Sequence, residues 1–288
     1  MISYRHHIVS LVAVFLALAI GVALGGGPLS DLGRDDRPAS ATTHEQRAVA
    51  RTASYGDDFA AVSAATLYAA GLRDHRVSVV TMPGAAGDVV SALGAQVEAA
   101  GGTITSTYDV QPTLTDGSKK SLVDALGSQL MTQLGSGAVT ADAPTYERLG
   151  QLIGLAVAGD DLPSADADSI RQSLAGAELM TSPEISARGP VVLVVLGDDV
   201  DPAILSGLMS GLAAKATGVV VVGDTASATP AGDLAALRDE PAADDVATVD
   251  GADTPLGQVT AVLALIRSLS VQGGSFGASG SDGAVPLK

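Results

Sequence analysis

Aspartates follow several Val-rich runs of this sequence, and carboxylates in such positions can bind a hard cation. The residues in question are Asp109, Asp198, Asp199, Asp224, Asp250 and Asp253. If the runs are parallel strands, their carboxyl ends share one edge of the sheet, where open α/β sheets usually hold ligands. Mg²⁺ and Ca²⁺ prefer such oxygen ligands, and Asp198, Asp224, Asp250 and Asp253 are the candidates. The alternative, which we favour, is that these residues cap the helices that follow, as Asp201 before Pro202 and Asp253 before Pro255 indicate.

The loop at residues 83–87 is a second candidate site, because it joins an expected strand to an expected helix. Backbone amides at the start of a helix can receive a phosphate. The loop contains Gly84 and Gly87 but lacks the full Gly-x-Gly-x-x-Gly spacing, and no basic residue follows closely. We therefore favour an ordinary tight turn.

Residues for nucleophilic or acid–base catalysis are sparse in this chain. It has 4 His and no Cys, and no Gly-x-Ser-x-Gly elbow is present. His6 and His7 precede a long apolar run, and His44 lies in an expected helical stalk. No catalytic pair or triad can be assembled, so we expect a protein that is not an enzyme, and the residues assign no cofactor.

Ligands for a soft metal are also scattered. Copper sites use clustered Cys, Met or His, whereas four methionines after the N-terminal region are isolated in sequence, namely Met82, Met131, Met180 and Met209. We expect each of them to fill a hydrophobic core. The metal ligands of this chain, if it binds copper, are therefore left unassigned by the sequence.

Short Val-rich runs alternate with longer helical segments from residue 71 onward, and these elements must position the candidate residues. Strands are expected at 77–82, 103–108, 191–196, 219–222 and 246–249. Helices are expected at 88–100, 119–134, 143–158, 165–179, 202–216, 230–237 and 255–268. Strands that are apolar throughout, rather than alternating, are typical of a parallel sheet covered on both faces. The predicted fold class is therefore α/β, with a mostly parallel, Rossmann-like sheet flanked by helices.

The N-terminal 27 residues predict a single transmembrane anchor. Residues 8–27 carry no charge, and 20 residues at a rise of ~1.5 Å cover a hydrocarbon core of roughly 30 Å. The alternative is a cleaved signal peptide, but its apolar core ordinarily runs only about 7–15 residues. We favour an uncleaved anchor that places the protein in the cell membrane or envelope, with the bulk of the chain exported.

Small residues recur at every fourth position of this anchor, at Ala13, Ala17, Gly21 and Gly25. Such a stripe lets two membrane helices approach closely. We therefore expect a homodimer or higher oligomer, or a pairing with a second membrane protein.

The rest of the chain divides by composition. We expect a linker at 28–42, a juxtamembrane helical stalk of one or two helices at 43–70, an exported α/β domain at 71–270 and a flexible Gly/Ser-rich tail at 271–288. The chain has 32 acidic and 16 basic residues, and the first 40 residues are neutral, so the net charge of −16 lies beyond them. Such an acidic surface argues against a nucleic-acid partner.

Three stretches of the chain carry a resemblance to a known family. The most specific is the start from Met1 to Gly25. The second is residues 71–84, a Gly-Leu followed by a basic-flanked strand and Pro-Gly, and the third is the Val-Asp-x-x-Asp-Thr segment at residues 249–258. These stretches resemble the actinobacterial MctB-type copper transporter family, with the second similar to its first strand. The resemblance implies an envelope protein that acts in copper efflux and resistance as a channel. It makes copper the expected metal and marks Asp250 and Asp253 as a family-characteristic surface.

Two hypotheses follow from these observations. The first is a copper-handling transport component, on the strength of the resemblance. The alternative is a non-catalytic, membrane-anchored scaffold in cell-envelope assembly or division, which binds a partner membrane protein and is favoured by the anchor, the stalk and the missing catalytic set.

Overall fold

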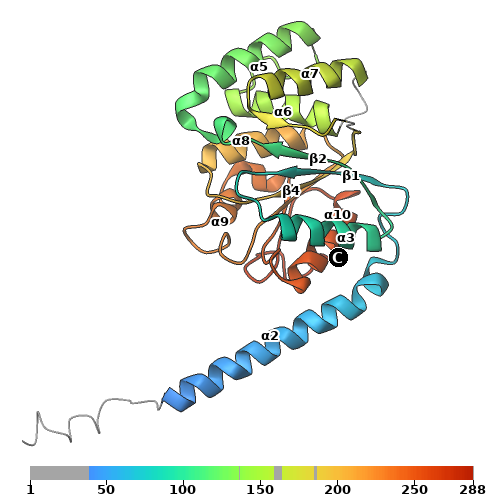
Figure 1. Ribbon diagram of the computed structural model, residues 1–288, viewed down its shortest axis with the longest axis vertical. Helices are drawn as coiled ribbons and strands as arrows, with labels where there is room; N and C mark the ends of the chain where they lie inside the picture. The colour runs from blue at the N-terminus through green and yellow to red at the C-terminus, as the bar shows by residue number, and fades with distance from the viewer. Residues whose placement is uncertain (1–38, 136, 159–163, 185–186, 288) are drawn as a thin grey trace, which may run out of the picture. The chain divides into compact units, whose positions relative to one another are not determined.

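A computed structural model describes residues 39–135, 137–158, 164–184 and 187–287 of the 288-residue chain (Figure 1). The chain divides into two compact units, residues 1–55 and 56–288. The predicted membrane anchor, with its stripe at Ala13, Ala17, Gly21 and Gly25, lies outside the described residues. Within the described ranges, no helix is long and apolar enough to cross a membrane.

A single helix, α2 (Ala39–Tyr68), belongs in part to each unit. It begins within the segment that we expected to be a linker and continues without interruption through the expected stalk. The stretch is rich in Ala, and Gly56 is its only Gly, with no Pro, so helix propensity favours continuous helix. In the second unit, Ala60, Ala64 and Tyr68 are buried in the domain core, whereas Phe59 and Val62 are exposed.

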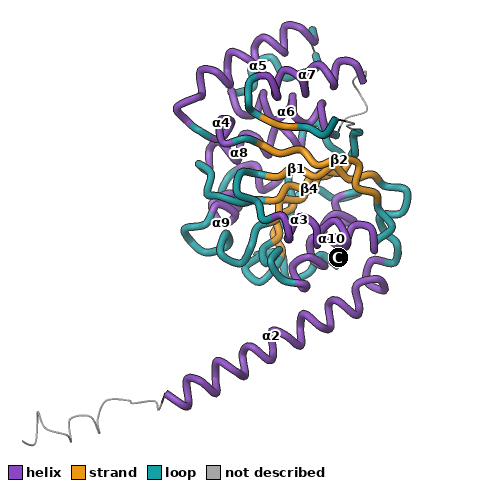
Figure 2. The backbone as a smooth tube through the Cα atoms, in the orientation of Figure 1, coloured by secondary structure: helices purple, strands orange, loops and turns teal. Residues whose placement is uncertain are grey.

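The second unit is built on one sheet, as Figure 2 shows. Its described strands are β1 (Arg76–Thr81), β2 (Thr103–Val110), β3 (Met180–Thr181), β4 (Val191–Val195), β5 (Gly218–Val222), β6 (Ala247–Val249) and β7 (Ser275–Phe276). The spatial order is β3-β2-β1-β4-β5-β6-β7, and every pairing is parallel except that of β3 with β2. The predicted fold class, α/β with a mostly parallel sheet, is confirmed.

Helices cover both faces of this sheet (Figure 1). They are α3 (Gly87–Ala99), α4 (Pro112–Thr115), α5 (Lys120–Leu134), α6 (Thr145–Val157), α7 (Ser164–Gly176), α8 (Pro202–Ala213), α9 (Asp233–Arg238) and α10 (Pro255–Ser268), with short 3₁₀ turns η2 (Gly117–Lys119) and η3 (Pro241–Asp244). One face packs against α5 to α9, and the other packs against α3, α10 and the end of α2.

The central strands are apolar on both faces because each face has its own core. In β4, Val192 and Val194 point to the side of α5 to α9, whereas Val191, Leu193 and Val195 point to the side of α3 and α10. All five residues are buried. This two-sided burial explains why the strand reads as a continuous apolar run in the sequence.

Helices α6 and α8 cross at very short range because glycines lie at the contact. A Cβ atom added to Gly150 would lie 2.3 Å from the carbonyl oxygen of Leu208, and one added to Gly211 would lie 2.1 Å from the carbonyl oxygen of Glu147. Ten residues of α6 are buried. The helical middle of the chain is therefore held on the sheet through a glycine contact between two helices.

Two elements differ from expectation at the ends of the sheet. The helical middle closes with a short strand, β3, where we expected none. Residues 275–276, expected in a flexible tail, form β7 beside β6, and Phe276 is buried. Both strands are only two residues long, so the sequence carries too few β-type residues to reveal them.

Candidate functional site at the carboxyl edge of the sheet

The strand order reverses between β1 and β4, which is where ligands bind in many sheets of this kind. Here the loops that follow the two strands are in contact. The amide of Asp198 donates to the carbonyl of Pro83 over 2.7 Å, and a Cβ atom added to Gly197 would lie 2.1 Å from the nitrogen of Ala85. The adjoining cavity measures about 90 Å³, well below the roughly 300 Å³ at which small-molecule sites begin.

The loop at residues 83–87 forms a tight turn, as we predicted from the sequence. The amide of Ala85 donates to the carbonyl of Met82, and Gly84 has a positive φ of 79°. A side chain at Gly84 would also collide with the carboxylate of Asp198, 2.2 Å from a built Cβ atom. Gly84 is therefore required both by the turn and by the neighbouring loop.

The capping alternative is right for one aspartate and wrong for another. Asp201 caps α8, since its carboxylate accepts hydrogen bonds from the amides of Ala203 and Ile204. The cap of α10 is Thr254 rather than Asp253. A hydroxyl can accept the first-turn amide as a carboxylate does, so the sequence alone did not separate the two neighbours.

Three of the other aspartates accept local hydrogen bonds. Asp253 accepts from the amide and hydroxyl of Thr225 at 2.8 and 2.9 Å, and Asp224 accepts from the amide of Ser227 at 2.7 Å. Asp109 accepts from the hydroxyl of Thr81 at 2.7 Å, and Asp198 is exposed beside Gly84. Among the described residues, no group of three or more His, Cys, Asp or Glu side chains could hold a metal ion. The hard-cation site therefore stays a prediction without an assembled ligand set.

The four methionines lie in the hydrophobic core, as we expected. Met82, Met180 and Met209 are buried, and Met131 is partly buried against the same cluster. All four pack on the α5 to α9 side of the sheet.

Asp233 is a residue of this edge that sequence reasoning missed. It is 4% exposed at the start of α9, and neither carboxylate oxygen has a hydrogen-bond partner among the described residues. Burial raises the pKa of Asp233 to about 6. The nearby amides of Leu234 and Asp233 oppose this rise, and the carboxylates of Asp199 and Asp224 add to it. An Asp in the first turn of a helix is common, so the sequence pattern gave no sign that this one is buried.

Asp250, at the end of β6, organises the C-terminal segment. It is 3% exposed, and it accepts hydrogen bonds from the amides of Ala278 at 2.6 Å and Ser279 at 2.9 Å, and from the Ser279 hydroxyl. The guanidinium of Arg238 lies 3.2 Å away and also donates to the carbonyl of Phe276. Burial alone would raise the pKa of Asp250, but these hydrogen bonds outweigh burial and hold it below its usual value.

Residue 277 has to be glycine for Asp250 to hold the C-terminal segment in this way. Its φ is +107°, and a Cβ atom there would lie 2.1 Å from a carboxylate oxygen of Asp250. The Val-Asp-x-x-Asp-Thr segment therefore has two distinct structural roles, because Asp250 holds residues 277–279 and Asp253 holds the loop after β5.

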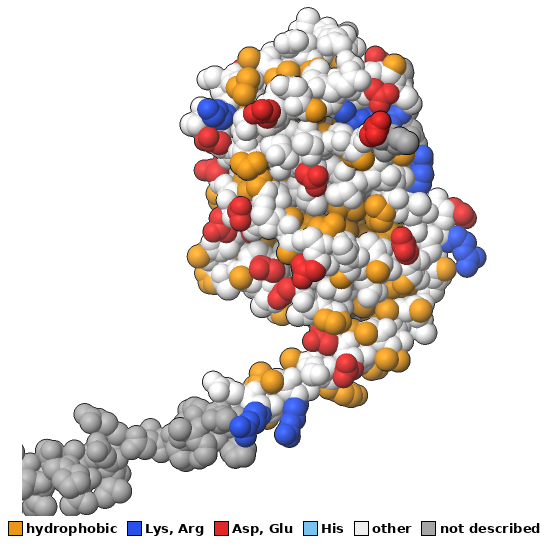
Figure 3. Space-filling model, viewed as in Figure 1, with side chains coloured by type: hydrophobic (Ala, Val, Ile, Leu, Met, Phe, Trp, Pro, Cys, Tyr) orange, Lys and Arg blue, Asp and Glu red, His pale blue; other side chains and the backbone are white. Residues whose placement is uncertain are grey.

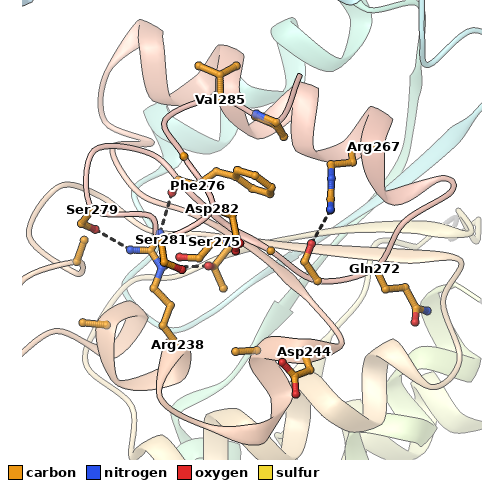
Figure 4. A pocket seen from close by; sticks show the side chains of 18 of the residues that line it. Arg238, Asp244, Arg267, Gln272, Ser275, Phe276, Ser279, Ser281, Asp282 and Val285 are labelled. Atoms are coloured by element: carbon orange, nitrogen blue, oxygen red, sulfur yellow. Dashed lines mark hydrogen bonds between the residues drawn. The ribbon is translucent and has the colours of Figure 1, made fainter. Parts of the chain in front are cut away.

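A polar pocket of about 1130 Å³ lies beside this network (Figure 4). Residues from α9, η3, the end of α10, β7 and the C-terminal segment line it, among them Arg238, Asp244, Arg267, Phe276 and Ser279. A second, mostly apolar cavity of about 360 Å³ shares Ser279 and Val285 with it. The C-terminal segment therefore forms a wall common to two cavities, and it is Asp250 that fixes this wall.

On the face of the folded domain shown in Figure 3, Asp and Glu side chains are spread out rather than gathered in one patch. Three Asp side chains line the pocket, namely Asp239, Asp244 and Asp282.

Comparison with known proteins covers nearly the whole chain. The copper transporter MctB of Mycobacterium tuberculosis (strain H37Rv) is 27% identical over 289 residues, which cover 92% of each chain. The copper transporter MctB of Mycobacterium leprae is 27% identical over 312 residues, covering 97% of this chain and 96% of the relative. The model of the family described as "Copper transport outer membrane protein, MctB" matches residues 1–287. This chain therefore belongs to the MctB family of copper transport proteins.

Proposed function

We propose that this protein acts in copper resistance in the cell envelope by lowering the copper content of the cell. The observation that carries the proposal is the family match over residues 1–287, because it includes the apolar N-terminal segment as well as the whole α/β domain. The relatives named as copper transporters align over 92% or more of their own lengths, so the likeness is not confined to one shared module.

We infer that the folded domain supports transport rather than forming a catalytic centre. The crevice at the strand-order reversal is closed to about 90 Å³, and the candidate carboxylates make hydrogen bonds within the protein. We therefore propose a role for the domain in binding and assembly, with copper as the transported substrate.

Deletion of the gene tests this function. The deletion strain should contain more copper per cell than the wild type during growth in copper-supplemented medium. Its growth should also stop at a lower copper concentration than that of the wild type. Zinc content, measured in the same samples by mass spectrometry, is the control and should stay the same. A deletion strain with wild-type copper content would refute the proposal.

Complementation with two forms of the gene tests the proposed envelope location. The full chain should restore copper content and should sediment with the envelope fraction. A chain that begins at Ala39 removes the predicted anchor and keeps every residue of α2. It should leave the envelope fraction and fail to restore copper content. Full complementation by the shortened chain would show that the anchor is not needed for copper handling.

A second candidate function is the non-catalytic scaffold in envelope assembly or division. The exposed apolar residues of α2 favour it, since Phe59 and Val62 are 59% and 86% exposed, and large exposed apolar side chains are typical of interaction surfaces. A photo-crosslinking amino acid at position 62 should capture a second copy or a membrane protein. Position 61, which is exposed on the same helix but lies about 100° around its axis from position 62, is the control. A division defect that is the same with and without added copper would favour this function over copper resistance.

A further inference from the structure

Arg267 presents a cation to the polar pocket that no carboxylate of the described residues neutralises. One of its terminal nitrogens donates to the carbonyl of Gly273 over 2.7 Å, and its guanidinium carbon lies 5.3 Å from the centre of the Phe276 ring. Figure 4 shows the Arg267 side chain at the pocket beside Phe276. The described ion pairs within 4.0 Å involve other arginines, so Arg267 keeps most of its N–H groups for a ligand.

Arg238, the other arginine of the pocket, has a different role. Its guanidinium donates to Thr248, Asp250, Ser279 and the carbonyl of Phe276. These contacts use its charge and most of its donors within the protein. Arg238 therefore builds the pocket wall, and Arg267 is the arginine available to a bound molecule.

Carboxylates of the same pocket provide the opposite charge. Asp239 and Asp244 are exposed, and their side chains accept no hydrogen bond from the residues that the structure describes. Asp282 is partly committed, because one of its oxygens accepts from the amide of Ser275 at 2.8 Å. The pocket thus offers one available guanidinium and two available carboxylates.

Ser275 lies in the wall of the pocket, but its Oγ atom is buried and has no hydrogen-bond partner among the described residues, so a bound molecule would not reach it. The lining further includes the polar side chains of Gln272 and Ser281.

We propose that this pocket binds a small zwitterionic ligand, with its carboxylate on Arg267 and its ammonium group on Asp239 or Asp244, as the ends of a short peptide would provide. A ligand with only negative charge would be repelled by the two available carboxylates, and a ligand with only positive charge would be repelled by Arg267. Arg forms paired hydrogen bonds with a carboxylate, and the contacts with the Phe276 ring and the Gly273 carbonyl hold the Arg267 guanidinium at the pocket. A volume of about 1130 Å³ has room for several residues of peptide.

Titration of the purified full-length chain with three peptides tests the ligand chemistry. Tri-alanine carries both charges, N-acetyl-tri-alanine lacks the ammonium group, and tri-alanine amide lacks the carboxylate. Isothermal calorimetry should detect binding of tri-alanine, and each blocked peptide should bind on the order of tenfold more weakly or worse, because each loses a charge-assisted contact. Failure of tri-alanine to bind at millimolar concentration, or equal binding of all three peptides, would overturn the proposal.

Substitution of Arg267 locates the site. Arg267→Gln should weaken tri-alanine binding on the order of tenfold or more and should no longer distinguish the amide from the free acid. Arg73→Gln removes an exposed arginine outside the pocket and should bind as the wild type does. Unchanged binding by the folded Arg267→Gln variant would contradict the site. The peptide series uses the wild-type chain, so it decides the ligand chemistry even if this variant does not fold, and neither experiment depends on the copper function.

Discussion

Replacement of Asp233 by Asn should stabilise the protein at neutral and alkaline pH and have no electrostatic effect near pH 3. The carboxyl is 4% exposed without a hydrogen-bond partner among the described residues, and burial raises its pKa from 3.8 to about 6. A rise of about two pH units corresponds to about 3 kcal/mol of lost stability once the group is ionised. Because Asn is neutral at every pH, the variant avoids this loss and should gain about 2 kcal/mol, after some allowance for relaxation around the site.

The sign of the pH dependence follows from the two pKa values. Below about pH 3, Asp233 is protonated in both the folded and the unfolded chain, so the substitution has no electrostatic effect. Between about pH 4 and pH 6 the unfolded chain releases its proton first, which favours unfolding, and the stability of the wild type falls. Above pH 6 both states are ionised, and the difference between the variant and the wild type stays constant.

Urea unfolding of the full-length chain at pH 4.5, 6 and 8, followed by circular dichroism, measures this effect. The free energy of unfolding of the Asp233→Asn variant should exceed that of the wild type by an amount that grows from pH 4.5 to pH 8. Asp142→Asn, which changes an exposed loop carboxylate, is the control and should show no such trend. A variant that is less stable than the wild type at pH 8 would refute the account of Asp233 as a buried, unpaired carboxylate.

Three further substitutions test the contacts that hold the fold together. Asp250→Asn should cost about 3–5 kcal/mol in the free energy of unfolding at pH 7, because it leaves Arg238 partly buried without its counter-ion. The wild type should also lose stability as the pH falls through the lowered pKa of Asp250. An unchanged urea midpoint for the variant would contradict this account. Gly211→Ala should lower the free energy of unfolding by about 1–3 kcal/mol, because the added Cβ atom collides at the α6 to α8 crossing. Gly94→Ala is the control, because a Cβ atom there meets nothing within 4 Å, and its free energy of unfolding, measured by thermal unfolding, should be unchanged or higher by about 0.5–1 kcal/mol. Asp201→Ala should cost about 1 kcal/mol through loss of the α8 cap, and a variant with wild-type melting temperature would show that the cap is dispensable.

The sequence predicted the central elements of the fold because their signals are strong and local. The bounds of the Val-rich strands β4 and β5 differ from the expected ones by one residue. Helix α10, with Pro255 in its first turn, has the bounds that the sequence predicted. The two-residue strands β3 and β7 were missed because they are defined by their neighbours in the sheet rather than by their own residues. Helix α9 was expected to begin at Pro230, but a turn in which the amide of Gly232 donates to the carbonyl of Thr229 delays it to Asp233.

The candidate site was only partly predictable, for a related reason. Sequence reasoning selected Asp250 from its place after a strand, and the structure gives that residue a central role, but as an anchor for residues 277–279. The pocket is formed by Arg238, Arg267 and Phe276, which lie on three different elements. No sequence pattern within one segment predicts that these side chains lie together, because only the folded chain brings them into contact with the same pocket.

The Gly/Ser-rich end of the chain has a further consequence for the behaviour of the sheet. Strand β6 is buried throughout. Without β7 it would be an edge strand with unpaired backbone groups, and a strand of another chain could pair with it. Residues 275–276 occupy this position, and the bond from the amide of Asp282 to the carbonyl of Ser275 covers part of their own outer side. The segment therefore protects the protein against edge-to-edge aggregation, and removal of residues 275–287 would be expected to produce insoluble rather than merely less stable protein.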